Sequence, residues 1–198
     1  MKNEVHEPDF TYGGQYTYAD YLQWTIDERL ELINGKIFKM SPGPNRVHQS
    51  LTGSIYVFLF NFLKHKSCKV FIAPFDIRLP RKSKEDKDII TVVQPDVCVV
   101  CDSEKIDDKG VVGAPDIVVE VLSPGNNAKE LKYKYEVYEE SGVKEYWIVS
   151  PQNKTFLIYT LKEGQFQPSK LMTSGDTITT SILPGFVLDL TELFDDLD

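Results

Sequence analysis

The fold is decided by two short runs, Gln94-Pro95-Asp96-Val97-Cys98-Val99-Val100 and Pro115-Asp116-Ile117-Val118-Val119-Glu120-Val121-Leu122-Ser123-Pro124. Both runs are rich in β-branched residues and are bounded by proline, which is the pattern of buried strands. Each run also carries a carboxylate, Asp96 or Glu120, and burying an ionised carboxylate without a partner is very costly. Two such acids on adjoining strands indicate a shared hard metal ion and hydrolysis of phosphate esters.

The geometry of an antiparallel pair brings these acids together. Side chains alternate along a strand, so Asp96 shares a face with Cys98, and Glu120 shares a face with Val118. Directly opposed residues have Cβ atoms about 5 Å apart, which suits two carboxylates that hold one divalent ion. Asp116 lies too far along the strand to share that ion, and we expect it to serve a turn or a cap. The alternative for Glu120 is a solvated position on an edge strand.

The remaining elements predict an α/β or α+β fold, with a mixed central sheet flanked by helices and an N-terminal β-hairpin. In the first half of the chain, hydrophobic spacing and the turn and cap residues predict a helix over 18–24 capped by Thr17, a hairpin over 29–40 that turns at Asn34-Gly35, a helix over 44–66 and a strand over 68–79. In the second half they predict strands over 92–101 and 115–122, a helix from Asn126 or Asn127 to Ser141 that ends at Gly142, and strands over 144–149 and 155–161.

The chain of 198 residues is 41% hydrophobic and 26% charged, which is typical of one globular domain. We expect a polar arm over residues 1–15 and a single domain over residues 16–198. The longest apolar run, 55–63, is too short to span a bilayer, and no signal peptide is apparent. These features predict a protein without a membrane partner.

The formal charge of −8 argues against a non-specific nucleic-acid binder, although an enzyme with a local basic rim remains compatible with it. One segment gathers five basic residues, diluted by acids, and we interpret it as a solvated loop. Its basic residues are Arg78, Arg81, Lys82, Lys84 and Lys87.

The cysteine count is three, from Cys68, Cys98 and Cys101. The spacing Cys98-x-x-Cys101 is compatible with a redox pair or half of a zinc site, but no second pair completes a ligand set. We therefore predict free, partly buried thiols, which indicate a reducing, cytoplasmic location.

Three further residues are candidates for the same site. On the helix after Glu120, Lys134 lies at the edge of the apolar stripe, from which it can reach the sheet with its stem buried; a surface lysine is the alternative. Glu31 sits among apolar residues of the hairpin, where it serves either as a metal or water ligand or as the partner of Arg29. His48 falls within the apolar stripe of its helix, either as a core histidine or as a contact to a substrate phosphate.

These segments together resemble the Uma2 family of nucleases, which has the PD-(D/E)XK restriction-endonuclease-like fold. The resemblance covers nearly the whole chain after about residue 15. It is carried by Arg29-Leu30-Glu31-Leu32-Ile33-Asn34-Gly35, Gln94-Pro95-Asp96, the run 115–124, Lys134-x-x-x-Tyr138, Gly142-Val143-Lys144-Glu145-Tyr146-Trp147-Ile148-Val149 and Pro184-Gly185-Phe186.

The resemblance implies that Asp96 and Glu120 are the metal-binding pair. The usual pattern of this fold places a lysine two residues after the second acid, but Leu122 stands there in this chain. The family supplies the lysine from the following helix, at the position of Lys134. Glu31 and His48 also match recurrent family positions.

We therefore expect a Mg²⁺-dependent endonuclease, with Mn²⁺ as a substitute ion, whose nucleic-acid partner is DNA. Asp96 and Glu120 hold the ion with the carbonyl of Val121, and Lys134 positions the attacking water. Glu31 holds a second ion or a bridging water, and we assign His48 to substrate binding. Two alternatives stay open, a hydrolase of another phosphoester and a catalytically silent or regulatory dimeric module. A homodimer is expected in either class.

Overall fold

The computed structural model describes residues 14–25, 28–40, 45–123 and 128–195. Most of the predicted arm, and the predicted helix cap at Asn126 or Asn127, lie outside these residues. Within the described parts, no helix is both long and apolar enough to cross a membrane.

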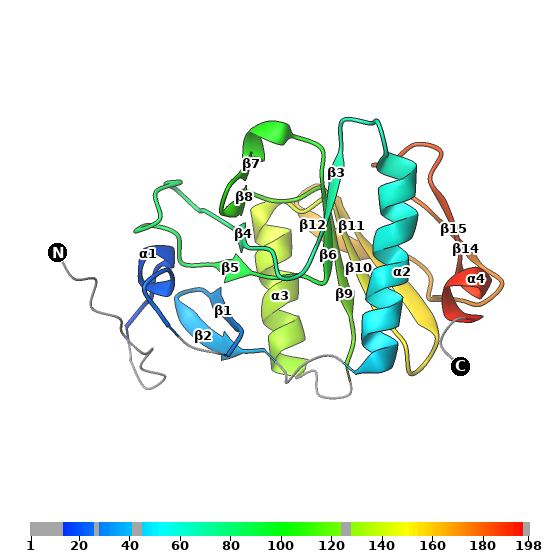
Figure 1. Ribbon diagram of the computed structural model, residues 1–198, viewed down its shortest axis with the longest axis horizontal. Helices are drawn as coiled ribbons and strands as arrows, with labels where there is room; N and C mark the ends of the chain where they lie inside the picture. The colour runs from blue at the N-terminus through cyan, green and yellow to red at the C-terminus, as the bar shows by residue number, and fades with distance from the viewer. Residues whose placement is uncertain (1–13, 26–27, 41–44, 124–127, 196–198) are drawn as a thin grey trace.

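A mixed sheet forms the centre of the fold, with strand order β12-β11-β10-β9-β6-β3 (Figure 1). Its β9–β10 pair is parallel and its other neighbouring pairs are antiparallel. The strands are β3 (Lys69–Ile72), β6 (Val97–Val100), β9 (Ile117–Val121), β10 (Glu145–Ser150), β11 (Thr155–Lys162) and β12 (Gln165–Pro168), with β13 (Met172–Thr173) paired to β11.

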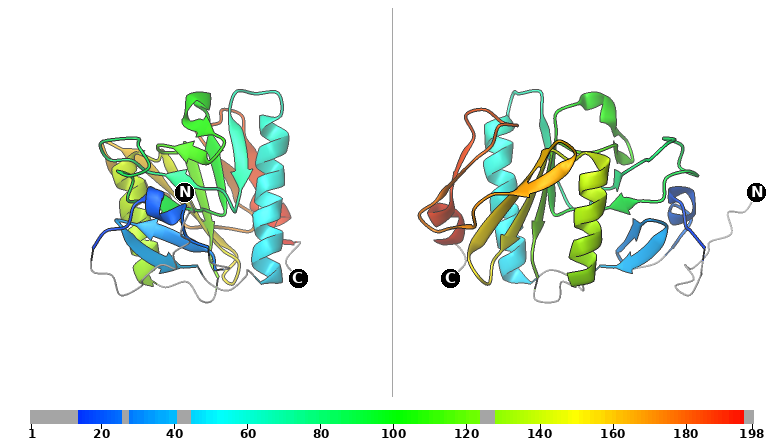
Figure 2. Two further views of the ribbon diagram at one scale, coloured as in Figure 1. Left: turned by 60° about the vertical axis from the view of Figure 1, so that its left-hand side comes forward. Right: turned by 180° about the vertical axis from the view of Figure 1, so that it is seen from behind.

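Two long helices cover opposite faces of this sheet, as Figures 1 and 2 show. One face packs α2 (Arg46–Leu63) through Leu51, Ile55 and Leu59, and the other packs α3 (Ala128–Ser141) through Val137 and Tyr138. Gly142 follows α3 with φ of 85°, a left-handed conformation that glycine adopts without steric cost. The prediction of a mixed sheet flanked by helices is therefore confirmed.

A second sheet has the order β2-β1-β5-β4-β8-β7 and contains the N-terminal hairpin. The hairpin pairs β1 (Leu30–Ile33) with β2 (Lys36–Lys39) through Asn34 and Gly35, both at positive φ, as predicted for this dipeptide. The other members are β4 (Ile77–Arg78), β5 (Val92–Val93), β7 (Ile106–Asp107) and β8 (Gly110–Val112). The remaining elements are α1 (Tyr18–Tyr21), capped by Thr17, the 3₁₀ turn Ser103–Lys105, the pair β14 (Thr177–Thr179) and β15 (Val187–Asp189), and α4 (Leu190–Asp195).

Two predicted strands are each divided between the two sheets. The segment 68–79 separates into β3 and β4, and the segment 92–101 separates into β5 and β6. Each break contains a proline, Pro74 or Pro95, which cannot donate a backbone hydrogen bond to a ladder. The chain thus passes from one sheet to the other at both prolines.

The prediction of free thiols is wrong for two of the three cysteines. Cys68 and Cys101 form a disulfide, and Cys98 is free and buried. Lys69 pairs with Val100 across β3 and β6, so the next antiparallel step places Cys68 opposite Cys101. Sequence spacing alone does not reveal this register.

The prediction that Arg78 lies in a solvated loop is also wrong. Arg78 is buried, with 2% exposure, and forms ion pairs with Asp107 and Asp86. The strand β4 carries it inward, and its guanidinium lies over the ring of Tyr18. The interpretation of Asp116 agrees with the structure, because its carboxylate accepts the backbone N–H of Cys101 and contacts Lys144.

Candidate functional site

The two acids of the sequence motif lie side by side at one end of the β6–β9 pair. Val97 pairs with Val119, so Asp96, one residue before β6, comes next to Glu120. The prediction that antiparallel pairing makes these residues neighbours therefore holds. Glu120 lies inside a strand whose every residue is buried, so it is not a solvated acid on an edge strand.

Lys134 reaches this pair from α3. Its Nζ atom lies 3.0 Å from Oε1 of Glu120 and 2.9 Å from Oε1 of Glu31, and only 3% of the residue is exposed. It is therefore not a surface lysine. Leu122 stands two residues after Glu120, and its backbone N–H donates to the carbonyl of Val149. The cation of the site thus comes from the helix and not from the strand.

Tyr138, one helical turn after Lys134, completes the contacts of Glu120. Its hydroxyl donates to Oε1 of Glu120 at 2.8 Å, and the side chain is fully buried. No sequence pattern predicted this bond. The available signal was the spacing, because residues four apart share one face of a helix.

Glu31 joins the site from the other sheet. Its Oε1 atom accepts the backbone N–H of Gln94 at 2.8 Å as well as the contact from Lys134. Its Oε2 atom is buried without a hydrogen-bond partner among the described residues. The suggested salt bridge between Glu31 and Arg29 is not formed, because Arg29 donates to the side-chain oxygen of Gln94 instead.

Asp96 is held from the side of α2. Its Oδ2 atom accepts the backbone N–H of Val121 at 2.8 Å and lies 3.2 Å from Nε2 of His48. His48 is in the first turn of α2, and its other ring nitrogen lies 3.5 Å from the hydroxyl of Thr52. Strict alternation would turn Asp96 toward α3, but this residue precedes β6 and its carboxylate is bonded to a residue of the opposite helix.

The electrostatics of the cluster follow from three carboxylates and one lysine, which contacts two of them. Burial raises the pKa of Glu120 to about 8; Lys134 opposes this shift, while Asp96 and Glu31 add to it. Burial lowers the pKa of Lys134, but Glu120 and Glu31 outweigh burial and hold that pKa well above its ordinary value. The cluster therefore attracts protons and, by the same charge imbalance, attracts cations.

The donor set fits a hexacoordinate cation that keeps several waters. Each of the three acids uses one oxygen in the contacts above, which leaves Oδ1 of Asp96 and the Oε2 atoms of Glu120 and Glu31 without protein hydrogen bonds in the described parts. Over the same residues, no three His, Cys, Asp or Glu side chains converge closely enough to enclose an ion. Mg²⁺ is usually held by only one or two carboxylates, with water and substrate phosphate as its other ligands.

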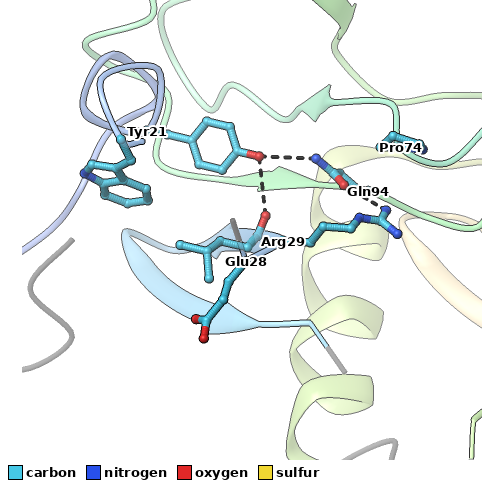
Figure 3. Close-up of a pocket in the computed structure, with 7 residues that line it drawn as sticks. Tyr21, Glu28, Arg29, Pro74 and Gln94 are labelled. Carbon is cyan, nitrogen blue, oxygen red and sulfur yellow. Dashed lines mark hydrogen bonds between the residues drawn. The ribbon is translucent and has the colours of Figure 1, made fainter. Parts of the chain in front are cut away.

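A pocket opens beside this cluster, between α1 and the start of the hairpin (Figure 3). Its volume is about 280 Å³, and it is lined by Tyr21, Trp24, Glu28, Arg29, Leu30, Pro74 and Gln94. Gln94 contacts both the acidic cluster and the pocket, since its backbone N–H donates to Glu31 and its side chain lines the pocket. The sequence analysis did not identify this pocket.

Comparison with known proteins identifies the family and the fold of this chain. A family model described as "Uma2: Putative restriction endonuclease" matches residues 18–191. "Uncharacterized protein slr1290" from Synechocystis sp. is 25% identical over 143 residues, which is 71% of each chain. Among solved structures, "a putative nuclease belonging to DUF820 from Anabaena variabilis" has the same fold, with a TM-score of 0.72 at 18% identity over 92% of this chain and 99% of that one.

The fold is thus that of the restriction-endonuclease-like nucleases. The chain belongs to the Uma2 family, since the family model covers most of its length.

Proposed function

We propose that this protein is a Mg²⁺-dependent endonuclease that hydrolyses phosphodiester bonds in DNA. The observation that carries the proposal is the buried Lys134, which contacts both Glu31 and Glu120 beside Asp96. A lysine and several carboxylates in one buried cluster are costly to desolvate, and such clusters concentrate at functional sites. Membership of a nuclease family supports the same reaction class.

Asp96 and Glu120 are the proposed ligands of Mg²⁺ or Mn²⁺, together with the carbonyl of Val121. A bound ion of this kind supplies a water of lowered pKa and a Lewis acid for the phosphate. The backbone N–H of Val121 and the ring of His48 fix Asp96, while Tyr138 fixes Glu120. Both carboxylates are therefore oriented before any ligand arrives.

Lys134 is the proposed group that positions the attacking water. An ammonium has three N–H donors, and Glu31 and Glu120 each take one, so one remains for a water or a phosphate oxygen. The buried Oε2 of Glu31 is a hydrogen-bond acceptor for the same water, or a ligand for a second ion. This pair of roles gives the water both a donor and an acceptor.

The first turn of α2 supports binding of a phosphate backbone, although the protein as a whole carries a net negative charge. Arg46 is the exposed first residue of this helix, and the first turn contains no acid. The N-terminus of a helix attracts anions through its free N–H groups and its dipole. His48 in the same turn stays a candidate for substrate binding, although its structural contact is with Asp96.

The test is cleavage of supercoiled plasmid in Mg²⁺, in Mn²⁺ and in EDTA. We expect the wild type to nick and linearise the plasmid only with a divalent ion, and Asp96→Ala and Glu120→Ala to lose at least 100-fold in rate. The exposed acid Asp108 gives a matched control, Asp108→Ala, which should cut like the wild type. Equal nicking by all four proteins would mean that the activity is a contaminant.

A homodimer is part of the proposal and is supported by apolar exposure on α2. Val57 and Phe60 are 52% and 47% exposed on the face of this helix that points away from the sheet. Light scattering of the purified protein measures the mass directly. A dimer without metal binding would favour the silent, regulatory class.

A further inference from the structure

The pocket beside the acidic cluster combines flat apolar walls with a polar edge. Tyr21 and Trp24 lie with ring centroids 5.6 Å apart, and Leu30 and Pro74 add apolar surface. Arg29, Glu28 and Gln94 supply the polar edge (Figure 3). With about 280 Å³, the pocket lies at the lower end of ligand sites and suits one planar ring system.

The floor of the pocket is fixed by hydrogen bonds around Gln94. Its side-chain oxygen accepts from Arg29 at 2.9 Å, and its side-chain nitrogen donates to Asp76 at 2.8 Å and to Tyr21 at 3.2 Å. Arg29 can only donate and a carboxylate can only accept, so the amide has one orientation. The pocket is therefore preorganised, which lowers the cost of binding a ligand.

Arg29 gives this edge its hydrogen-bond donors. A guanidinium has five N–H groups, and the described structure uses one of them on Gln94. The Glu28 carboxylate points away from the Arg29 guanidinium (Figure 3) and is paired with Lys39 at 2.7 Å, so these two groups do not face one ligand together. Guanine offers O6 and N7 as two adjacent acceptors for an arginine, so it fits Arg29 better than the other bases do.

The pocket also lies close to the proposed cleavage site. Gln94 is two residues before Asp96, so their Cα atoms lie at most about 7 Å apart. The backbone N–H of Gln94 binds Glu31, which joins the pocket wall to the acidic cluster by a single residue. A base that enters the pocket therefore places an adjacent phosphate near the carboxylates.

We propose that this pocket binds one unstacked guanine of the substrate strand, next to the phosphate that is cleaved. The proposal rests on the proposed nuclease function and adds its base preference. Stacking on aromatic side chains is worth about 1–3 kcal/mol per base, which offsets the few kcal/mol needed to take a base out of a duplex. Single-stranded or distorted DNA should therefore be cut faster than a perfect duplex.

The test is quenching of Trp24 fluorescence in the Glu120→Gln protein in EDTA, so that no cleavage or metal binding enters the signal. The only other tryptophan, Trp147, is fully buried, and Trp24→Phe shows that the signal comes from the pocket. We expect GMP to quench, AMP and CMP to bind at least 10-fold more weakly, and ribose 5-phosphate to give no response. Arg29→Ala should weaken GMP at least 10-fold, whereas Arg81→Ala, a change at an exposed arginine paired with Glu140, should not.

A second arm separates a base in a strand from a free nucleotide. A single-stranded hexanucleotide with one guanine should bind at least 10-fold more tightly than GMP, and an abasic site in place of that guanine should abolish the gain. Equal affinity for GMP and the hexanucleotide would make this a free-nucleotide site and overturn the proposal, as would the absence of quenching. Guanine-dependent quenching in a protein that never cuts DNA would refute the nuclease function alone, and cleavage without quenching would refute the pocket alone.

Discussion

The Nζ atom of Lys134 lies 2.9 Å from Oε1 of Glu31, and both side chains are almost completely buried. Glu31 belongs to the sheet of the N-terminal hairpin, whereas Lys134 belongs to the helix that covers the central sheet. This ion pair therefore joins the two sheets through the acidic cluster. The attraction between two buried charges offsets the cost of removing them from water. Removal of one partner leaves the other charge buried and unpaired, which is strongly destabilising.

Replacing Lys134 with methionine should remove both stability and activity. Glu31 and Glu120 would then remain buried without their cation, and the free energy of unfolding should fall by about 3–5 kcal/mol at pH 8. Urea unfolding measures this loss, and plasmid cleavage should drop below detection. The control is Lys132→Met on the exposed side of the same helix, with a change of at most about 0.5 kcal/mol. Equal free energies of unfolding for the two variants would mean that Lys134 does not stabilise the buried carboxylates.

The raised pKa of Glu120 should make the stability of the metal-free protein depend on pH. The folded protein holds a proton up to about pH 8, whereas the unfolded chain releases it near pH 4.5. The stabilisation from this proton is fully present below about pH 4.5 and is lost as the pH rises through about 8.

Glu120→Gln removes that titration. The free energy of unfolding of the wild type, relative to this variant, should therefore decrease between pH 5 and pH 9 in EDTA. Glu140→Gln, at an exposed acid, is the matched control. Parallel curves for wild type and Glu120→Gln over the whole range would show that Glu120 ionises normally.

Divalent ions should stabilise the wild type and not the Asp96→Asn variant. At a free ion concentration 100 times the Kd, binding to the folded state alone adds about 2.7 kcal/mol. Because Glu120 must lose its proton to bind the ion, affinity for Mn²⁺ should rise from pH 6 to pH 8.5 and protons should be released. Calorimetry in two buffers of different ionisation enthalpy measures both effects. Binding that is independent of pH would place the ion away from Glu120.

The Cys68–Cys101 disulfide should leave one reactive thiol in the unfolded, unreduced protein and three after reduction. The bond closes a loop with a sequence separation of 33, so Cys101→Ser should lower the free energy of unfolding by about 4 kcal/mol. Thiol titration and urea unfolding measure the two outcomes. Three thiols before reduction would show that the bond does not form in the purified protein.

Local patterns predicted the parts of the fold that depend on neighbouring residues. Asn34-Gly35 indicated the hairpin because both residues tolerate positive φ, and the β-branched runs indicated β6 and β9 with their register. The disulfide and the burial of Arg78 depend on which strands meet, and no local pattern contains that information. The amide of Gln94 is another such case, since it contacts residues from three distant segments.

The position of Lys134 beside the site of Glu120 was predicted from its helix stripe, but its direct contact with Glu31 was not. Helical spacing shows which face a residue occupies, so a lysine at the edge of an apolar stripe was recognisable as a candidate. The contact with Glu31 requires the hairpin sheet to dock against α3, a tertiary event. The face of Asp96 was wrong for a similar reason, because strand alternation stops where the strand stops.

The ion pair between Glu31 and Lys134 also joins an early and a late segment of the chain. The hairpin with Glu31 leaves the ribosome long before the helix with Lys134, and neither fragment contains a complete cluster. A chain cut off before Lys134 therefore lacks a complete cluster. Under the proposed function, nuclease activity is a property that the cell receives only with the finished fold.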